Sequence, residues 1–263
     1  MSKYSALPSV FLSHGAPSLL IDDSAAHQFL HGLGRYLGQP EAILVISAHW
    51  CTAMPALTGA ERPETIYDFW GFADALYEKS YPALGSPVLA QEVAGMLSAQ
   101  GFQVDIHPSR GLDHGAWVPL MLMYPDAAIP VVQLSVQPSQ DTLYHLRIGQ
   151  ALYGLRKQGI LIMGSGGATH NLSDFRGQAI DAEPANYALA FDAWLEEQIV
   201  CGNTQALLDY LKRGPSAAKN HPTAEHFLPL IVAQGAATPG THGRVLHKSF
   251  QYSVLSMAAY AWD

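Results

Sequence analysis

Short apolar segments that alternate with longer amphipathic segments constrain the fold of this chain more than any other feature. Ala42–Ile46 is apolar throughout, and Pro130–Val136 and Ile160–Met163 have a similar character. Strands without polar alternation are typical of a sheet covered on both faces. Apolar residues at helical spacing occur in four other segments: Ser24–Tyr36, Pro87–Gln100, Thr142–Lys157 and Asn186–Val200. This alternation predicts an α/β sandwich whose central, mostly parallel or mixed sheet carries helices on both faces.

The size and charge of the chain narrow the classes of protein that it can belong to. Its 263 residues are 49% hydrophobic, which is enough for one large core, so we expect a single domain over residues 1–263. The formal net charge of -8 disfavours nucleic acid and anionic membranes as partners, because both need clusters of basic residues. No segment reaches the roughly 18 apolar residues of a membrane span.

The N-terminus and the cysteines favour a cytoplasmic protein. Met1–Tyr4 runs directly into a predicted strand, without the apolar region and cleavage site of a secretory signal. Cys51 and Cys201 are far apart in the sequence, and we expect two free thiols in a reducing cytosol.

Histidines gather at the ends of predicted strands and in turns rich in glycine or proline. Five of the twelve histidines stand in such places: His14, His49, His114, His170 and His226. Ligands of open α/β sheets bind beyond the carboxyl ends of the strands, and His14 and His49 both occupy that position. Imidazole is the commonest metal ligand and the side chain best poised for proton transfer near neutral pH. The five histidines therefore predict a metal-dependent enzyme.

Acidic neighbours leave two of these positions open to more than one interpretation. Asp113 either orients His114 or caps a helix that begins near Ala116. A helix from Pro222 or Thr223 to about Ala233 would place His226 in its first turn, with Glu225 as a second candidate ligand. Adjacent helix positions point about 100° apart, so only one of this pair should face a given site.

The other histidines are expected to have no role in the site. His27 and His31 have a metal-capable spacing on a helix, but they lack the glutamate of the His-Glu-x-x-His motif and indicate a solvated face. The remaining five are predicted to lie on the surface: His107, His145, His221, His242 and His247. The aromatic segment Tyr67–Phe72 either lines a pocket for a flat substrate or is a loop packed on the core.

Five motifs, in order and with similar spacing, resemble the class III extradiol ring-cleavage dioxygenases, and in particular their DOPA-type branch. The resemblance extends from about residue 8 to residue 260. Its motifs are LSHGAP (Leu12–Pro17), VISAHW (Val45–Trp50), DHGAW (Asp113–Trp117), VQLS (Val132–Ser135) and PTAEHFLPL (Pro222–Leu230).

The resemblance implies a single α/β domain with a non-haem iron or zinc site at the strand ends. His14, His49 and His226 match the metal-binding positions of the family. His170 matches a position that is either a further metal ligand or the acid/base beside the metal. His114 matches a second-sphere histidine that contacts substrate or oxygen.

The chain departs from the family pattern at two places. Many members have proline where this chain has Ala73, so the shape of the aromatic loop, and with it the substrate preference, is open. The protocatechuate branch uses two histidines and a glutamate, whereas the third position here is His226. Three neutral imidazoles suit zinc well, so we expect Fe(II) for activity and Zn(II) in the purified or crystallised protein.

The function implied is ring opening of a DOPA-like catechol with incorporation of O2, which gives a muconate-type semialdehyde. Two alternatives use the same pocket: a zinc-dependent hydrolase and a non-enzymatic binding relative. The residues alone select neither the catechol, nor the ring bond, nor the oligomeric state. The sequence shows no clear arginine for binding a substrate carboxylate, since none of the three loop candidates stands out: Arg62, Arg110 and Arg176.

Overall fold

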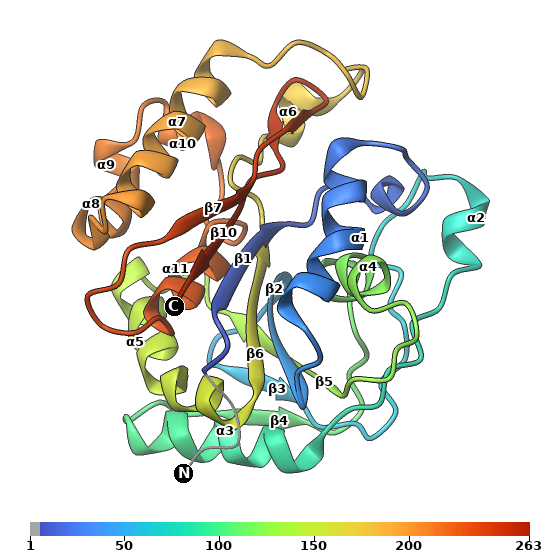
Figure 1. Cartoon of the computed structure of the whole chain (residues 1–263), viewed down its shortest axis with the longest axis vertical. Helices are drawn as coiled ribbons and strands as arrows, with labels where there is room; N and C mark the ends of the chain where they lie inside the picture. The colour runs from blue at the N-terminus through green and yellow to red at the C-terminus, as the bar shows by residue number, and fades with distance from the viewer. Residues whose placement is uncertain (1–5) are drawn as a thin grey trace.

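A mixed sheet of eight strands forms the centre of the computed structural model, which describes residues 6–263 (Figure 1). The strands lie in the order β4-β3-β5-β2-β6-β1-β10-β7. Their bounds are β1 Ser9–Ser13, β2 Ala42–Cys51, β3 Ala56–Thr58, β4 Asp105–His107, β5 Val131–Val136, β6 Ile160–Gly166, β7 Arg244–His247 and β10 Ala259–Trp262. A separate small hairpin pairs β8 (Phe250–Gln251) with β9 (Leu255–Ser256).

The middle of the sheet is parallel, which places the carboxyl ends of its strands at one edge. Strand β2 pairs in parallel with β5 on one side and with β6 on the other, and β6 pairs in parallel with β1. Strands β10 and β7 then add in antiparallel orientation beyond β1. The prediction of a mostly parallel or mixed sheet is confirmed.

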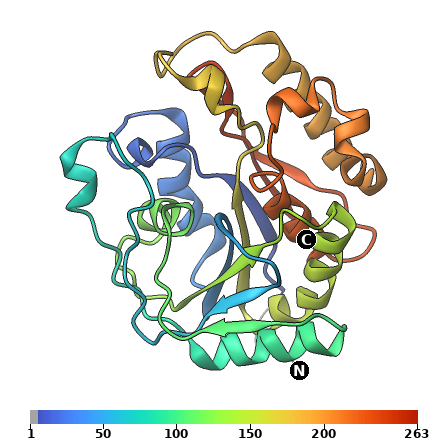
Figure 2. The same cartoon turned by 180° about the vertical axis from the view of Figure 1, so that it is seen from behind.

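Helices cover both faces of this sheet, as the apolar strands predicted (Figures 1 and 2). Ile43 and Val45 of β2 share one apolar cluster with α1 (Ala25–Leu37) and α4 (His114–Met123). The alternate residues Leu44 and Ile46 share another cluster with three helices of the opposite face: α3 (Pro87–Ala99), α5 (Thr142–Leu152) and α11 (Leu228–Gly235). Both sides of each central strand are therefore buried, which accounts for the absence of polar alternation.

The long helices lie close to where the sequence places them. Helix α1 follows Ser24, whose side chain accepts a hydrogen bond from the His27 N–H, and α7 spans Asn186–Val200 as predicted. The predicted helix Thr142–Lys157 is divided, because the 3₁₀ segment η2 (Tyr153–Gln158) follows α5. The shorter elements are η1 (Pro17–Leu20), α2 (Asp74–Tyr77), α6 (Leu172–Phe175), α8 (Thr204–Leu208), α9 (Tyr210–Arg213) and α10 (Ala217–Asn220).

Two sequence expectations concern the chain as a whole. Among the described residues, no helix combines the length and the apolar character needed to cross a bilayer. Cys51 and Cys201 are exposed free thiols, as expected.

Two histidines that we expected on the surface are buried, His145 and His221. His145 Nδ1 lies 2.8 Å from the Asp141 carbonyl, and its Nε2 accepts a hydrogen bond from the Gln137 N–H. His221 Nε2 donates to the Ala168 carbonyl at 3.0 Å. His145 bonds backbone groups through both ring nitrogens and His221 through Nε2, which explains how these polar side chains are accommodated there.

The burial of His221 makes the stability of the fold depend on pH. Burial lowers the pKa of His221 to about 3, whereas an unfolded chain leaves it near 6.5. Between these values the unfolded state binds one more proton, so this residue's contribution to stability falls as the pH falls below about 6.5.

We therefore expect His221→Gln to flatten the pH dependence of the unfolding free energy. The slope should change by about 1.4 kcal/mol per pH unit over this range, because the variant lacks the one proton that His221 takes up on unfolding. Glutamine keeps a donor for the Ala168 carbonyl. Urea denaturation of the metal-free protein at pH 4.5 to 6.5 measures the slope. Identical slopes for the variant and the wild type would contradict the prediction.

Candidate active site

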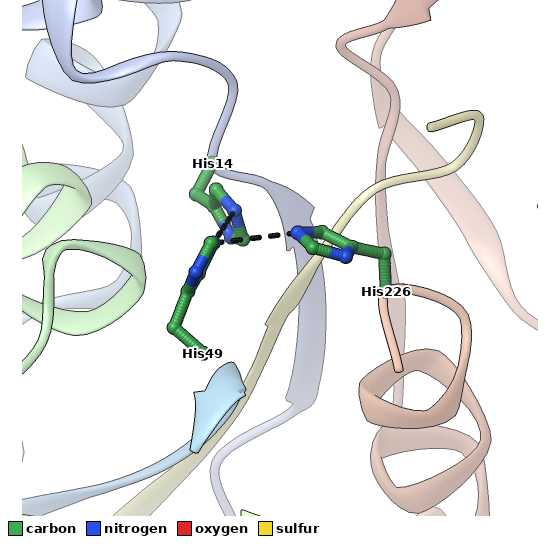
Figure 3. A group of neighbouring side chains, drawn as sticks. All are labelled: His14, His49 and His226. Atoms are coloured by element: carbon green, nitrogen blue, oxygen red, sulfur yellow. Dashed lines mark hydrogen bonds between the residues drawn. The ribbon is translucent and has the colours of Figure 1, made fainter. Parts of the chain in front are cut away.

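Three imidazoles from distant parts of the chain meet at the carboxyl edge of the sheet (Figure 3). His14 directly follows β1, His49 lies near the end of β2, and His226 precedes α11. The His14 and His49 Nε2 atoms are 2.9 Å apart, and the His49 and His226 Nε2 atoms are 3.3 Å apart. The structure thus brings His14, His49 and His226 together, as the sequence predicted. We call these three residues the triad cluster.

The backbone before α11 reaches the sheet because a glycine leaves room for it. A Cβ atom on Gly166, at the end of β6, would lie 2.2 Å from the His226 carbonyl oxygen. Any other residue at position 166 would push the His226 backbone away from the sheet. Gly166 is thus a packing feature of the site.

The predicted start of the last helix was wrong by about five residues. Helix α11 begins at Leu228, and His226 lies in the preceding turn, where the Phe227 N–H donates to the Ala224 carbonyl. Pro229 accounts for the shift. Proline lacks an N–H and fits the first turn of a helix, where that donor would have no partner within the helix.

Ser165 of β6 fixes the protonation of His14. Its hydroxyl donates to the Gly115 carbonyl, so the Ser165 oxygen can only accept from His14 Nδ1, which lies 3.0 Å away. The proton of the neutral His14 ring therefore sits on Nδ1, and its Nε2 lone pair points into the triad cluster.

A carboxylate plays the same part for the His226 ring, and another lies near the His49 ring. Glu225 Oε1 lies 3.1 Å from His226 Nδ1 and accepts a second hydrogen bond from Thr223. A carboxylate only accepts, so His226 also carries its proton on Nδ1. Asp68 Oδ2 lies 3.5 Å from His49 Nδ1. Glu225, which the sequence offered as a second candidate ligand, thus contacts the far side of the His226 ring.

This donor set fits a metal ion. Burial, with a further contribution from the neighbouring histidines, lowers the pKa of each triad ring well below 6.5, so all three are neutral at neutral pH. Three Nε2 lone pairs that face one another repel unless a cation lies among them. Ligands bound at about 2.0–2.1 Å in a tetrahedral site lie roughly 3.3 Å apart, close to the separations found here.

Ser165→Ala should weaken metal binding without removing a ligand. Loss of an outer partner of a metal-binding histidine typically lowers metal affinity by about 10–100-fold, because the tautomer and ring orientation are no longer fixed. Competition with a chromophoric chelator measures this affinity. Ser173→Ala, at an exposed position on α6, is the matched control. An affinity equal to that of the wild type would show that Ser165 does not orient His14.

His170 lies beside the triad cluster and outside it. Its ring stacks on that of His226, with centroids 3.4 Å apart and planes inclined by 8°. The His170 backbone N–H donates to the Asn220 carbonyl, which fixes the segment between β6 and α6. Burial and then the nearby His114 lower the pKa of His170 to about 4.

Asp68, which the sequence patterns did not single out, holds His114 in place. Asp68 Oδ1 accepts the His114 backbone N–H at 2.9 Å and also lies 2.9 Å from the ring Nδ1. The His114 ring lies 3.8 Å from the His49 ring between centroids. Burial by itself would raise the pKa of Asp68, but its contacts with His114 and His49 hold the pKa below its usual value.

Asp113 precedes α4, and its side chain makes no capping hydrogen bond to that helix. Its buried carboxylate accepts hydrogen bonds from Ser47 at 2.6 Å and from Gln133. Burial, opposed by these bonds, raises the pKa of Asp113. The Ser47 hydroxyl in turn accepts the backbone N–H of His49 at 3.2 Å, so Asp113 supports the strand that carries His49.

A pocket of about 770 Å³ opens onto four of the five predicted histidines, and His226 is not among its lining residues. Its walls include His14, His49, His114 and His170, which the sequence had singled out. The aromatic segment Tyr67–Phe72 contributes Asp68, Phe69, Trp70 and Phe72, so the interpretation of this segment as a pocket wall is confirmed.

Comparison with known proteins identifies the class of chemistry. The family described as the catalytic LigB subunit of aromatic ring-opening dioxygenase matches residues 8–262. The chain belongs to this family. A 4,5-DOPA dioxygenase extradiol of Beta vulgaris is 44% identical over 95% of this dioxygenase and 94% of the relative. One of Escherichia coli K12 is 38% identical over 88% and 85% of the two chains.

A solved structure confirms the fold of this dioxygenase. The crystal structure of an uncharacterized protein from Escherichia coli K12 superimposes with a TM-score of 0.82 and 33% sequence identity. The superposition covers 98% of this chain and 100% of the chain in that structure. The family assignment agrees with the dioxygenase expected from the sequence and does not favour the hydrolase or the binding protein. Ring-opening dioxygenases of this family depend on a non-haem metal, and the triad cluster is suited to hold one.

Proposed function

We propose that this enzyme opens the ring of a DOPA-like catechol with O2, in one catalytic domain that spans residues 1–263. His14, His49 and His226 hold the metal, and the observation that carries this assignment is the convergence of their three Nε2 lone pairs. Fe(II) is the active metal, and Zn(II) is the expected occupant of the purified protein. Bound Fe(II) supplies the positive charge that acidifies a catechol hydroxyl and the redox chemistry that O2 requires.

His170 acts as the acid/base beside the metal in this proposal. The lone pairs of rings stacked face to face lie in separate, nearly parallel planes, so the His170 and His226 lone pairs do not aim at a common point. This geometry favours the acid/base role of His170 over the role of a fourth ligand. With a pKa of about 4, the ring is neutral at neutral pH, and a ring nitrogen can accept the proton of a catechol hydroxyl.

His114 contacts the substrate or the oxygen, and Asp68 positions it. The charged Asp68 carboxylate contacts both the backbone N–H and the ring Nδ1 of His114, which directs the other ring nitrogen away from Asp68. His114 lines the same pocket as His170, so the two rings can hold and return protons during ring opening.

The aromatic residues of the pocket wall suit a flat substrate. Phe69 is buried and its ring lies 5.7 Å from that of His114, while Phe72 packs edge-on against Phe69. An apolar wall of this kind offers a catechol ring a contact surface and keeps water from the reacting carbons. The product of ring opening is a muconate-type semialdehyde.

Oxygen uptake with a panel of catechols tests the proposal. The protein is stripped of metal, reconstituted anaerobically with Fe(II) or with Zn(II), and mixed with DOPA and other catechols in aerated buffer. We expect Fe(II) to support stoichiometric O2 consumption and a yellow ring-opened product, and Zn(II) to support neither. The absence of O2 uptake with every catechol would overturn the proposal. Anaerobic cleavage of esters by the Zn(II) form would instead support the hydrolase.

A further inference from the structure

The structure separates the three arginines that the sequence offered as carboxylate-binding candidates. Arg110 lies 4.6 Å from the centroid of the Trp50 ring, and its Nη2 is 3.3 Å from Asp113. Arg62 is exposed and lies outside the lining of the pocket. Arg176, the residue that ends α6, lines the same pocket as His14 and His170. Only Arg176 is therefore placed to meet a substrate.

Arg176 is exposed, and within residues 6–263 no hydrogen bond or ion pair engages its guanidinium. The acidic residue nearest to it in sequence, Asp174, already binds Lys219 at 3.1 Å and the Tyr187 hydroxyl at 2.9 Å. The positive charge of Arg176 thus remains available to an anion inside the pocket.

The negative charge of the pocket is, by contrast, already engaged. Asp68 is the one carboxylate among the lining residues that the structure describes, and it contacts His114 and His49. Apart from Asp68 and Arg176, the polar groups of the lining are imidazoles, hydroxyls and backbone. A bound ammonium group would meet no free carboxylate here.

We propose that Arg176 binds the carboxylate of the substrate's side chain and that the pocket does not recognise a side-chain amine. The preferred substrates are then catechols with an anionic side chain, whether or not they carry an amine. This assignment rests on the proposed catechol-binding site. The catechol lies at the triad cluster, and its side chain occupies the same pocket, whose lining includes Trp70, Leu172 and Arg176. Arginine suits this task because its planar fork pairs with both oxygens of a carboxylate.

Calorimetric titration under anaerobic conditions tests the assignment without relying on turnover. The Fe(II)-loaded protein is titrated with four catechols: dihydroxyphenylpropanoate, which has only a carboxylate; DOPA, which has both groups; dopamine, which has only an amine; and ethylcatechol, which has neither. We expect dihydroxyphenylpropanoate and DOPA to bind about tenfold more tightly than dopamine and ethylcatechol. This is the gain expected from one charge-assisted hydrogen-bonded pair in a partly solvated site.

Three variants give the expectation its controls. Arg176→Ala should bring all four catechols to the affinity of ethylcatechol, while the affinity for ethylcatechol itself stays unchanged and reports an intact pocket. Arg176→Lys should restore part of the preference for carboxylates, because the charge remains and the planar fork is lost. Arg213→Ala removes an exposed arginine on α9, outside the pocket lining, and should behave as the wild type.

Two results would overturn the assignment. The first is dopamine binding to the wild type as tightly as dihydroxyphenylpropanoate. The second is a carboxylate preference that survives in Arg176→Ala. Oxygen uptake by the same preparations separates this inference from the proposed function. A carboxylate preference without O2 consumption would refute the dioxygenase activity and leave Arg176 as an anion-binding residue.

Discussion

Replacing His14 with alanine is expected to remove stable metal binding and, with it, ring-opening activity. The substitution takes away one of three nitrogen donors, whose Nε2 atom lies 2.9 Å from that of His49. Changes to outer partners already cost about 10–100-fold in metal affinity, so the loss of a donor should cost more than about 100-fold. Metal content per chain after reconstitution and gel filtration measures the loss, and oxygen uptake with DOPA reports its consequence.

His31→Ala is the matched control for this experiment. His31 is exposed on α1, which the sequence identified as a solvated helix face, and its loss should change neither metal content nor turnover. Circular dichroism and thermal unfolding of the metal-free proteins show whether His14→Ala keeps the fold. A folded His14→Ala protein that binds one metal ion with wild-type affinity would refute the assignment of the triad cluster as the metal site.

Replacing His170 with alanine is expected to lower turnover strongly while metal binding is retained. The protein should keep its metal, because the ring stacks on His226 and is not aimed into the triad cluster. Turnover should fall by about 10²–10⁴-fold, the usual contribution of a positioned general acid or base. Because the substrate is held elsewhere, its dissociation constant should change little, so the loss should appear in kcat.

Added imidazole offers a further test of the His170 assignment. The His170→Ala substitution leaves space beside His226 for a small base. Rescue of turnover by free imidazole would support proton transfer by the missing ring. A His170→Ala protein that loses its metal along with its activity would show instead that His170 is a fourth ligand. Metal analysis and single-turnover kinetics on one preparation separate the two outcomes.

The sequence was sufficient to predict the layers of the fold and most of its long elements. Because β2 is buried on both faces, its sequence is apolar from Ala42 to Ile46. This local pattern can be recognised without knowledge of the tertiary structure. The end of β2 was not readable in the same way. The apolar segment ends at Ile46 and His49 was expected where the strand gives way to a loop, yet β2 continues to Cys51, because that residue pairs with Val136 of β5 beyond an irregularity in the register.

The residues that tune the site were harder to predict than those that form it. The histidines were recognisable because each follows a strand or a turn. Ser165 is separated from His14 by 151 positions and Asp68 from His114 by 46, so no periodic pattern links either pair. His145 and His221 were misplaced for a related reason. Backbone partners supplied by the fold compensate for their burial, and sequence polarity does not report such partners.

The span of chain between the triad histidines has a consequence for how the enzyme matures. His49 and His226 are 177 positions apart, and His14 lies nearer still to the N-terminus. In the proposed assignment the ion can bind tightly only after the ribosome has released the segment that carries His226. Metal then closes a loop that includes most of the polypeptide and lowers the entropy of any partly unfolded state. Iron and zinc should therefore compete for this site only after synthesis has passed His226.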